Sequence, residues 1–413
     1  MSLLLWLTAA ILSLCTGLRQ SLGLFLPPMT LELGISATAF SFAVALQAIV
    51  WGVSQPLVGM LADRVGTRPV LVGASLVYAS GLVLMGHPGG ALGLDLGGVL
   101  VGLGTAGTGL GVVLGAVSRA VAPERRSQTV GAVAAAGSIG TFLLAPIGQW
   151  LIDGVGWRTA LLALAAIAAS MALLALPVRD VSTNAGTSGA AAEDTRSLRE
   201  VLRAAARHPG YLAMTAAFFA CGFQLMFITM HLPAYLASCG LPPGVGATAM
   251  AIIGLCNTVG TYTVGLLGAR YRQKRLLALI YLLRTLSIVV FLAVPITRTS
   301  TLVFAAAMGL LWLGVAPLVS GLVGRVFGLK YFGTLYGFVF LSHQLGSMAG
   351  VLLGGIAFDL TQSYGAAWGA LIAIGLLAFM LQWPMNDHPL VARPRRAAAP
   401  SHATLLVADR SSE

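Results

Sequence analysis

The chain has 413 residues, of which 57% are hydrophobic and only 9% are charged. A water-soluble protein of this size needs far more charge on its surface, so the composition excludes a soluble domain and predicts a chain that crosses a membrane many times. The formal net charge of +11 would suit a nucleic acid, but basic residues of a membrane protein belong first to its loops, and no nucleic-acid partner is predicted.

Twelve apolar runs are long enough to cross a bilayer as helices, which takes roughly 20 residues each. The sequence therefore predicts an all-α membrane protein with twelve transmembrane helices surrounded by lipid. We expect these spans near residues 3–27, 37–62, 69–88, 96–118, 127–152, 157–177, 210–236, 245–269, 275–295, 301–324, 332–358 and 365–384.

The basic residues predict the orientation of the chain in the membrane. With these spans, 20 of the 24 Lys and Arg residues fall on one side, only Arg158 and Arg298 fall on the other, and Arg19 and Arg284 lie within spans. Loops rich in Lys and Arg stay in the cytoplasm. We therefore expect a multi-pass protein of the inner (cytoplasmic) membrane with both termini in the cytoplasm.

An internal repeat divides the chain into two halves. Several residues recur at a constant offset of 206 positions, including Gly59 with Gly265, Arg64 with Arg270, Arg119 with Arg325 and Asp153 with Asp359. The offset contains six spans, so the halves are parallel six-helix repeats related by an axis along the membrane normal. We assign residues 1–177 to the N-terminal half, 178–209 to a cytoplasmic linker with a basic amphipathic helix, 210–384 to the C-terminal half, and 385–413 to a disordered cytoplasmic tail.

A short polar turn, Gly59-Met60-Leu61-Ala62-Asp63-Arg64-Val65-Gly66-Thr67-Arg68, joins the second and third spans. Gly59 would let two helices approach closely, Gly66 would allow a tight reversal, and Arg64 and Arg68 would hold the turn in the cytoplasm. The turn resembles the G-x-L-A-D-R-x-G-x-R/K signature of the major facilitator superfamily. The resemblance implies a substrate site at the membrane midplane between the halves. It also implies that Asp63 closes the cytoplasmic side by contacting a helix N-terminus of the other half.

Ionisable side chains within a span are costly and therefore mark candidate functional residues. Arg19, Arg284 and His343 lie within spans, whereas no Asp or Glu lies near the middle of one. Two buried cations without a buried acid predict that the solute supplies an anion, in the simplest case a carboxylate held by Arg19, alone or together with Arg284. The predicted substrate-binding set is Arg19, Gln20, Gln224, Asn257, Arg284, His343 and Gln344.

Each of the three ionisable residues also has a structural alternative. Arg19 could bond backbone carbonyls instead of a solute. Arg284 could brace a neighbouring helix, because the resemblance places the ninth span among scaffold helices. His343 is the candidate for carrying a coupling proton, and the alternative is a neutral imidazole that hydrogen-bonds across helices.

The first span carries Arg19-Gln20-Ser21-Leu22-Gly23-Leu24-Phe25, which resembles the monocarboxylate and oxalate/formate porter branches of the superfamily. Monocarboxylate porters place an Asp, and four residues later an Arg, in the eighth span. This chain has Asn257 and Thr261 at those places. Because the usual coupling pair is missing, the resemblance does not extend to proton-coupled transport of the lactate type.

The sequence thus predicts a monomeric secondary transporter that moves a small organic anion by alternating access, with a proton or a counter-anion as the coupling partner. An exporter of drugs or metabolites working as an antiporter, or a receptor that binds without transporting, remains an alternative. No phosphate-binding loop, metal-ligand spacing or mid-span acid–base pair is present in the sequence, so we predict no cofactor, no metal and no enzymatic activity.

Overall fold

The structure, a computed structural model, describes residues 3–121, 123–178, 197–327 and 331–387. Within these ranges every regular element is a helix, and eleven stretches are long and apolar enough to cross a membrane. One of them, Ala135–Ala175, contains a chain reversal at Gly156 with φ 79° and therefore crosses twice. The described residues confirm the predicted all-α membrane fold with twelve crossings.

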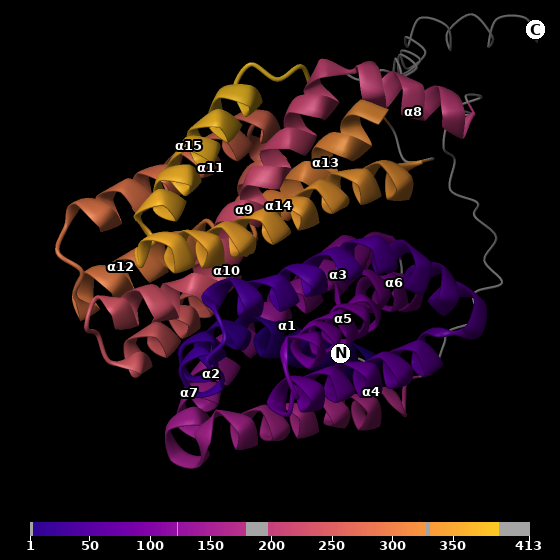
Figure 1. Cartoon of the computed structure of the whole chain (residues 1–413). Coiled ribbons are helices and arrows are strands. Elements are labelled where there is room, and N and C mark those ends of the chain that lie inside the picture. The colour runs from indigo at the N-terminus through magenta and orange to yellow at the C-terminus, as the bar shows by residue number, and fades with distance from the viewer. Residues whose placement is uncertain (1–2, 122, 179–196, 328–330, 388–413) are drawn as a thin grey trace, which may run out of the picture.

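The N-terminal half forms the indigo-to-magenta layer of Figure 1. Its helices are α1 (Leu3–Ser21), the 3-10 helix η1 (Leu22–Phe25), α2 (Leu26–Leu33), α3 (Ala37–Val65), α4 (Thr67–Gly86), α5 (Ala91–Thr108), α6 (Leu110–Ala120) and α7 (Pro123–Ala175). The first crossing is longer than predicted because η1 and α2 continue it to Leu33. The fourth crossing is broken at Gly109, whose backbone is extended.

The C-terminal half forms the rose-to-yellow layer of Figure 1. Its helices are α8 (Leu198–Arg207), α9 (Pro209–Ser238), α10 (Pro243–Arg270), α11 (Gln273–Ala293), α12 (Arg298–Leu310), α13 (Val315–Phe327), α14 (Phe332–Thr361) and α15 (Gly365–Gln382). The predicted span 301–324 is in fact two helices, α12 and α13, separated by a non-helical turn at residues 311–314. That turn leaves backbone groups that need partners from elsewhere.

The two halves contact each other mainly through two helix pairs, α3 with α14 and α7 with α10 (Figure 1). We call the end of the molecule where α3 passes into α4 the Gly66 end. The opposite end, where α3 begins and α14 finishes, is the Asp359 end. Both pairs run between these ends, so a change in the angle between the halves would open one end while it closes the other.

At the Asp359 end the halves are joined by hydrogen bonds. The Asp359 carboxylate on α14 accepts from the backbone N–H groups of Ala37, at 3.0 Å, and Thr38, at 2.8 Å, in the first turn of α3. Near the middle, the Gln344 side chain donates to the Ala48 carbonyl at 3.1 Å. From Val53 to Ala62, the described side chains of α3 make no hydrogen bond, ion pair or ring contact with the C-terminal half. The described contacts of this helix pair therefore hold the Asp359 end and the middle together.

Two segments outside the crossings also pack on the fold. Helix α8 begins with a capping box between Ser197 and Glu200, and its Val201 and Ala205 are buried, so its apolar face packs on the rest of the chain. Asp387 is buried beside Lys274, with an N–O distance of 3.3 Å. The first residues assigned to the tail are therefore tied to the C-terminal half. Residues 179–196 of the predicted linker and the tail from residue 388 lie outside the described residues.

Candidate functional site

Arg19 lies near the middle of the Leu3–Leu33 crossing and is half-buried between the two halves. It donates to the Met226 sulfur on α9 at 3.2 Å, and its guanidinium carbon lies 5.0 Å from the ring centre of Trp51 on α3. A thioether sulfur is a weak hydrogen-bond acceptor, and the face of an indole ring is not a conventional acceptor. Within the described residues Arg19 forms no ion pair and no bond to a backbone carbonyl. Its strong N–H donors are therefore available to a ligand.

A row of aromatic side chains extends from Arg19 into the C-terminal half. The ring of Trp51 meets that of Phe340 on α14 edge to face, with centroids 5.3 Å apart. Phe340 in turn stacks parallel to the His343 ring at 6.1 Å, and Phe218 on α9 lies 4.8 Å from the same imidazole. The site is thus built by α1 and α3 from one half and by α9 and α14 from the other.

His343 and Gln344 form one polar unit on α14. The His343 Nδ1 lies 3.1 Å from the Gln344 Oε1 and 3.5 Å from the hydroxyl of Ser347, one helical turn further on. The Gln344 Nε2 donates across the halves to the Ala48 carbonyl at 3.1 Å. Both ends of the Gln344 amide are therefore engaged, and this residue links His343 to the N-terminal half.

Arg284 on α11 is fully buried and bonds to the protein itself. Its Nε donates to the Leu311 carbonyl at 2.9 Å, one terminal nitrogen donates to the carbonyls of Leu311 and Trp312, and the other donates to the Cys221 sulfur at 3.3 Å. Those carbonyls lie at the break between α12 and α13, where helical partners are missing. This geometry favours the bracing role that the sequence left open, rather than a place in the cavity wall.

Asn257 on α10 holds the other side of the same break. Its Oδ1 accepts from the backbone N–H of Leu313 and from the hydroxyl of Thr261, both at 2.9 Å. Its Nδ2 donates to the Ser138 hydroxyl on α7, in the other half, at 2.8 Å. The residue is 2% exposed. Its amide therefore joins a broken helix to the interface between the halves. This is a structural role, different from the one predicted for Arg19.

Gln20 and Gln224, the two remaining residues of the predicted set, lie inside helix packing. Gln224 donates to the Leu371 carbonyl on α15 at 3.2 Å and is fully buried. Gln20 is buried too, and its Oε1 has no partner among the described residues. The structure thus brings Arg19, His343 and Gln344 together at one part of the interface between the halves, places Asn257 at another, and leaves both of these glutamines covered.

Three residues of this site were not predicted from the sequence: Trp51 and Met226, which contact Arg19, and Phe340, which contacts Trp51. Aromatic and Met side chains are common in apolar spans and carry no periodic signal of function. One feature of the sequence could have drawn attention to Trp51. Gln55 follows it by four residues, so the two side chains lie on the same helix face. The indole N–H does donate to the Gln55 oxygen, at 2.8 Å.

The polar turn has one predicted feature and lacks another. Gly66 has φ 96°, a conformation that favours glycine, and the tight reversal between α3 and α4 is confirmed. At Gly59 a Cβ atom would meet no atom of the described residues within 4 Å, so the predicted close helix approach is not seen among them. Arg64 and Arg68 are exposed. The side chain of Asp63 lies outside the described part of the structure.

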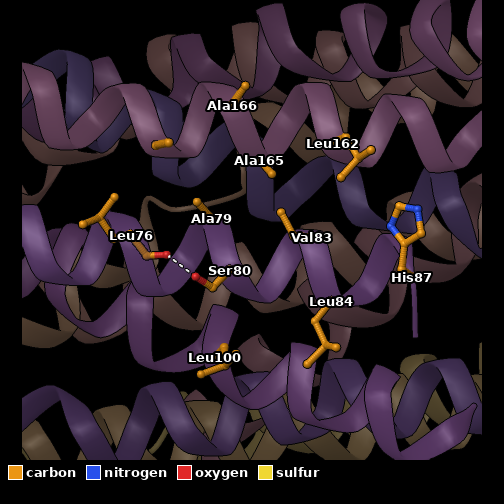
Figure 2. Close-up of a pocket in the computed structure, with 11 residues that line it drawn as sticks. Leu76, Ala79, Ser80, Val83, Leu84, His87, Leu100, Leu162, Ala165 and Ala166 are labelled. Carbon is orange, nitrogen blue, oxygen red and sulfur yellow. Dashed lines mark hydrogen bonds between the residues drawn. The ribbon is translucent and has the colours of Figure 1, made fainter. Parts of the chain in front are cut away.

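A groove of about 730 Å³ lies among α4, α5 and α7 of the N-terminal half (Figure 2). Its wall is almost wholly apolar, and Leu76 and Val83 beside it are 50% and 44% exposed. These are the properties of a groove that faces lipid, and none of the predicted site residues belongs to it. The lining residues are Leu76, Ala79, Ser80, Val83, Leu84, His87, Leu100, Leu162, Ala165, Ala166 and Ala169.

Comparison with known proteins agrees with this architecture. The family model of the Major Facilitator Superfamily matches residues 5–351. The chain is 26% identical to monocarboxylate transporter 13 of Rattus norvegicus, over 88% of this chain and 84% of that protein. It is 24% identical to the oxalate:formate antiporter of Oxalobacter formigenes, over 94% of this chain and 92% of that protein.

Solved structures share the same fold. A bacterial homolog of the human lysosomal transporter Spinster, in an inward-facing and unoccupied conformation, matches with a TM-score of 0.75 and 15% identity, covering 94% of this chain and 98% of that one. The D-xylose-proton symporter matches with a TM-score of 0.73 at the same identity, covering 94% and 98%. The twelve crossings in two halves, the polar turn at Gly66 and the match over most of its length together show that this chain belongs to the major facilitator superfamily.

Proposed function

We propose that the protein is a secondary active transporter that carries a small organic anion across the inner membrane by alternating access, with Arg19 binding the carboxylate. The observation that carries the proposal is a half-buried guanidinium in mid-membrane whose described partners are a thioether and an indole face. Guanidinium pairs bidentately with carboxylate, and a low-dielectric site strengthens the pair. Relatives named for monocarboxylates and for oxalate and formate support the same substrate class.

The charge of the loops supports a cytoplasmic location of the Gly66 end and of both termini, because 20 of the 24 basic residues fall on that side. With this orientation, the hydrogen bonds of Asp359 close the outer side of the transporter. In the conformation described here, the proposed outer side is thus the closed one. Asp63 in the polar turn would close the Gly66 end when the Asp359 end opens, through the N-terminus of a helix of the other half.

Coupling is proposed to pass through His343, with a proton as the coupling ion, or to consist of exchange for a second anion. His343 is half-buried, beside the aromatic rings that follow Arg19, and its Nδ1 contacts Gln344. Imidazole is the side chain whose ordinary pKa allows a proton to be taken up and released near neutral pH. A proton bound there would add positive charge to the site and favour the binding of an anion.

Counterflow in proteoliposomes tests this function directly. Vesicles loaded with an unlabelled carboxylate would take up the labelled compound through wild-type protein. We expect Arg19→Gln to reduce this uptake by more than tenfold, since it removes the charge but keeps hydrogen-bonding atoms. Arg298→Gln, at an exposed position at the Asp359 end, serves as the matched control and should transport normally. Carboxylate uptake that is unaffected by Arg19→Gln, or transport limited to neutral and cationic amphiphiles, would overturn the proposal.

A further inference from the structure

Among the described residues, Arg19 is the permanently charged side chain that the site offers to a ligand, although the sequence places two arginines within crossings. Arg284 is fully buried, and its nitrogens are engaged by Leu311, Trp312 and Cys221. Arg19 is half-buried and keeps its strong donors free of the described residues. A ligand with one carboxylate is therefore matched to Arg19, whereas a second carboxylate would have a cationic partner only when His343 carries the proposed proton.

The polar side chains beside Arg19 are already engaged with the protein. The Trp51 indole N–H donates to the Gln55 oxygen at 2.8 Å, and the Gln55 nitrogen donates to the Ala106 carbonyl at 3.2 Å. The Gln344 amide is engaged at both ends, by His343 and by Ala48. These bonds hold the polar groups toward the protein, so a ligand hydroxyl finds fewer free partners here than a carboxylate finds on Arg19.

Two buried amides nearby do have unpartnered atoms, but they are covered. Gln20 is 4% exposed with an unpartnered Oε1, and Gln47 is 2% exposed with neither amide atom bonded among the described residues. Arg19, Trp51, Phe340 and His343, by contrast, are each partly exposed and lie where the halves meet. A ligand that enters between the halves meets these four first.

Resting on the proposed function, we propose that Trp51 and Phe340 form an apolar subsite next to Arg19, and that the substrate is a monocarboxylate with an aromatic or similarly bulky apolar group. The carboxylate pairs with Arg19, which lies 5.0 Å from the Trp51 ring centre, and the apolar group packs on the two rings. Aromatic contacts of this kind are most favourable edge to face or offset, as Trp51 and Phe340 themselves are arranged.

The subsite also spans the two halves, because Trp51 is on α3 and Phe340 is on α14. A ring that contacts both side chains binds the halves to one another in mid-membrane. Such a ligand differs from one held by Arg19 alone, which would contact the C-terminal half only near Met226. The apolar group of the substrate thus contributes to selectivity and to the contact between the halves.

Binding of four acids to the purified full-length chain, measured by isothermal titration calorimetry, tests the inference. Phenylacetate and benzoate are the aryl monocarboxylates, lactate adds a hydroxyl group and lacks the ring, and oxalate adds a second carboxylate. We expect wild type to bind phenylacetate at least about tenfold more tightly than lactate. Trp51→Ala and Phe340→Ala should each reduce this preference by about threefold to tenfold. Trp51→Phe and Phe340→Leu, which preserve more of the packing, should reduce it less.

Phe338→Ala is the matched control, because Phe338 is on the same helix and 51% exposed on its outer side. It should leave the preference unchanged. Equal affinity of wild type for all four acids, or the same preference in Trp51→Ala, Phe340→Ala and Phe338→Ala, would refute the subsite. Arg19→Gln separates failure of the subsite from failure of the proposed function. If carboxylate binding depends on Arg19 but shows no preference for aryl groups, the subsite alone is refuted. If carboxylate binding is the same in wild type and Arg19→Gln, both proposals are refuted.

Discussion

The carboxylate of Asp359, near the end of α14, caps the first turn of α3 in the other half, with its Oδ2 2.8 Å from the Thr38 nitrogen. A helix N-terminus carries unsatisfied N–H groups and a partial positive charge, so an anion there stabilises the contact. The sequence predicted this kind of contact for Asp63 at the opposite end of α3. In the structure the described contact of this kind lies at the Asp359 end.

Asp359→Asn should therefore favour opening of the Asp359 end. Loss of the charge removes about 0.3–1 kcal/mol of stabilisation at the helix N-terminus, which shifts the equilibrium by roughly twofold to fivefold. The measurement is the labelling rate of Ser41→Cys, a buried position in α3 at this end, with Cys239 and Cys256 replaced by Ser. Asp153→Asn is the control, because the equivalent Asp153 bonds to Gln149 within its own half. Equal labelling in both variants would contradict the role of Asp359.

Arg284 should stabilise the fold without contributing to ligand affinity. In Arg284→Met the Leu311 and Trp312 carbonyls lose a charged donor, and we expect the unfolding free energy to fall by about 1.5–3 kcal/mol. Thermal unfolding in detergent measures this loss, with Arg298→Met as an exposed control that should change little. Carboxylate affinity of the folded variant should equal that of wild type. A stable variant that no longer binds carboxylates would instead place Arg284 in the substrate site.

His343→Gln should abolish uptake driven by a pH gradient and leave anion exchange intact, if His343 carries the coupled proton. Gln keeps a polar side chain beside Gln344 but cannot take up a proton. The two modes are measured in the same proteoliposomes, with and without a pH gradient. His87→Gln, in the groove among α4, α5 and α7, is the control and should leave both modes unchanged. Loss of both modes in His343→Gln alone would indicate a role in binding or packing.

His208 predicts a pH dependence of stability outside the membrane crossings. It is the N-cap of α9, where its Nδ1 accepts from the Tyr211 backbone N–H at 3.1 Å, and burial lowers the pKa of its imidazole below the ordinary 6.5. The folded state therefore binds this proton less readily than the unfolded state does. Stability is fully present above pH 6.5 and decreases as the pH falls through the lowered folded pKa.

The pH dependence due to His208 can be isolated by His208→Asn, because Asn caps a helix without titrating. The thermal midpoint of wild type should fall relative to that of the variant between pH 6.5 and pH 5. Parallel pH profiles for the two proteins would show that His208 contributes nothing to this dependence.

The number of crossings, the division into two halves and the presence of Arg19 within a crossing were all predictable from the sequence. Each depends on a local property: the length of an apolar run, an offset between similar residues, or a charge where apolar residues are the rule. The reversal at Gly66 was also local, because it requires only a residue that tolerates positive φ.

The roles of the polar residues within the crossings depended on the tertiary structure. Arg19 and Arg284 look alike in sequence, yet only Arg284 meets the free carbonyls of a broken helix, and the sequence did not signal that break. Trp51 and Phe340 come together because α3 and α14 pack across the halves. In a membrane, hydrophobicity determines which segments cross but not which helix faces meet, since lipid and protein interior are equally apolar. Only the packing of the twelve crossings decides which buried charge has a partner and which is left for a ligand.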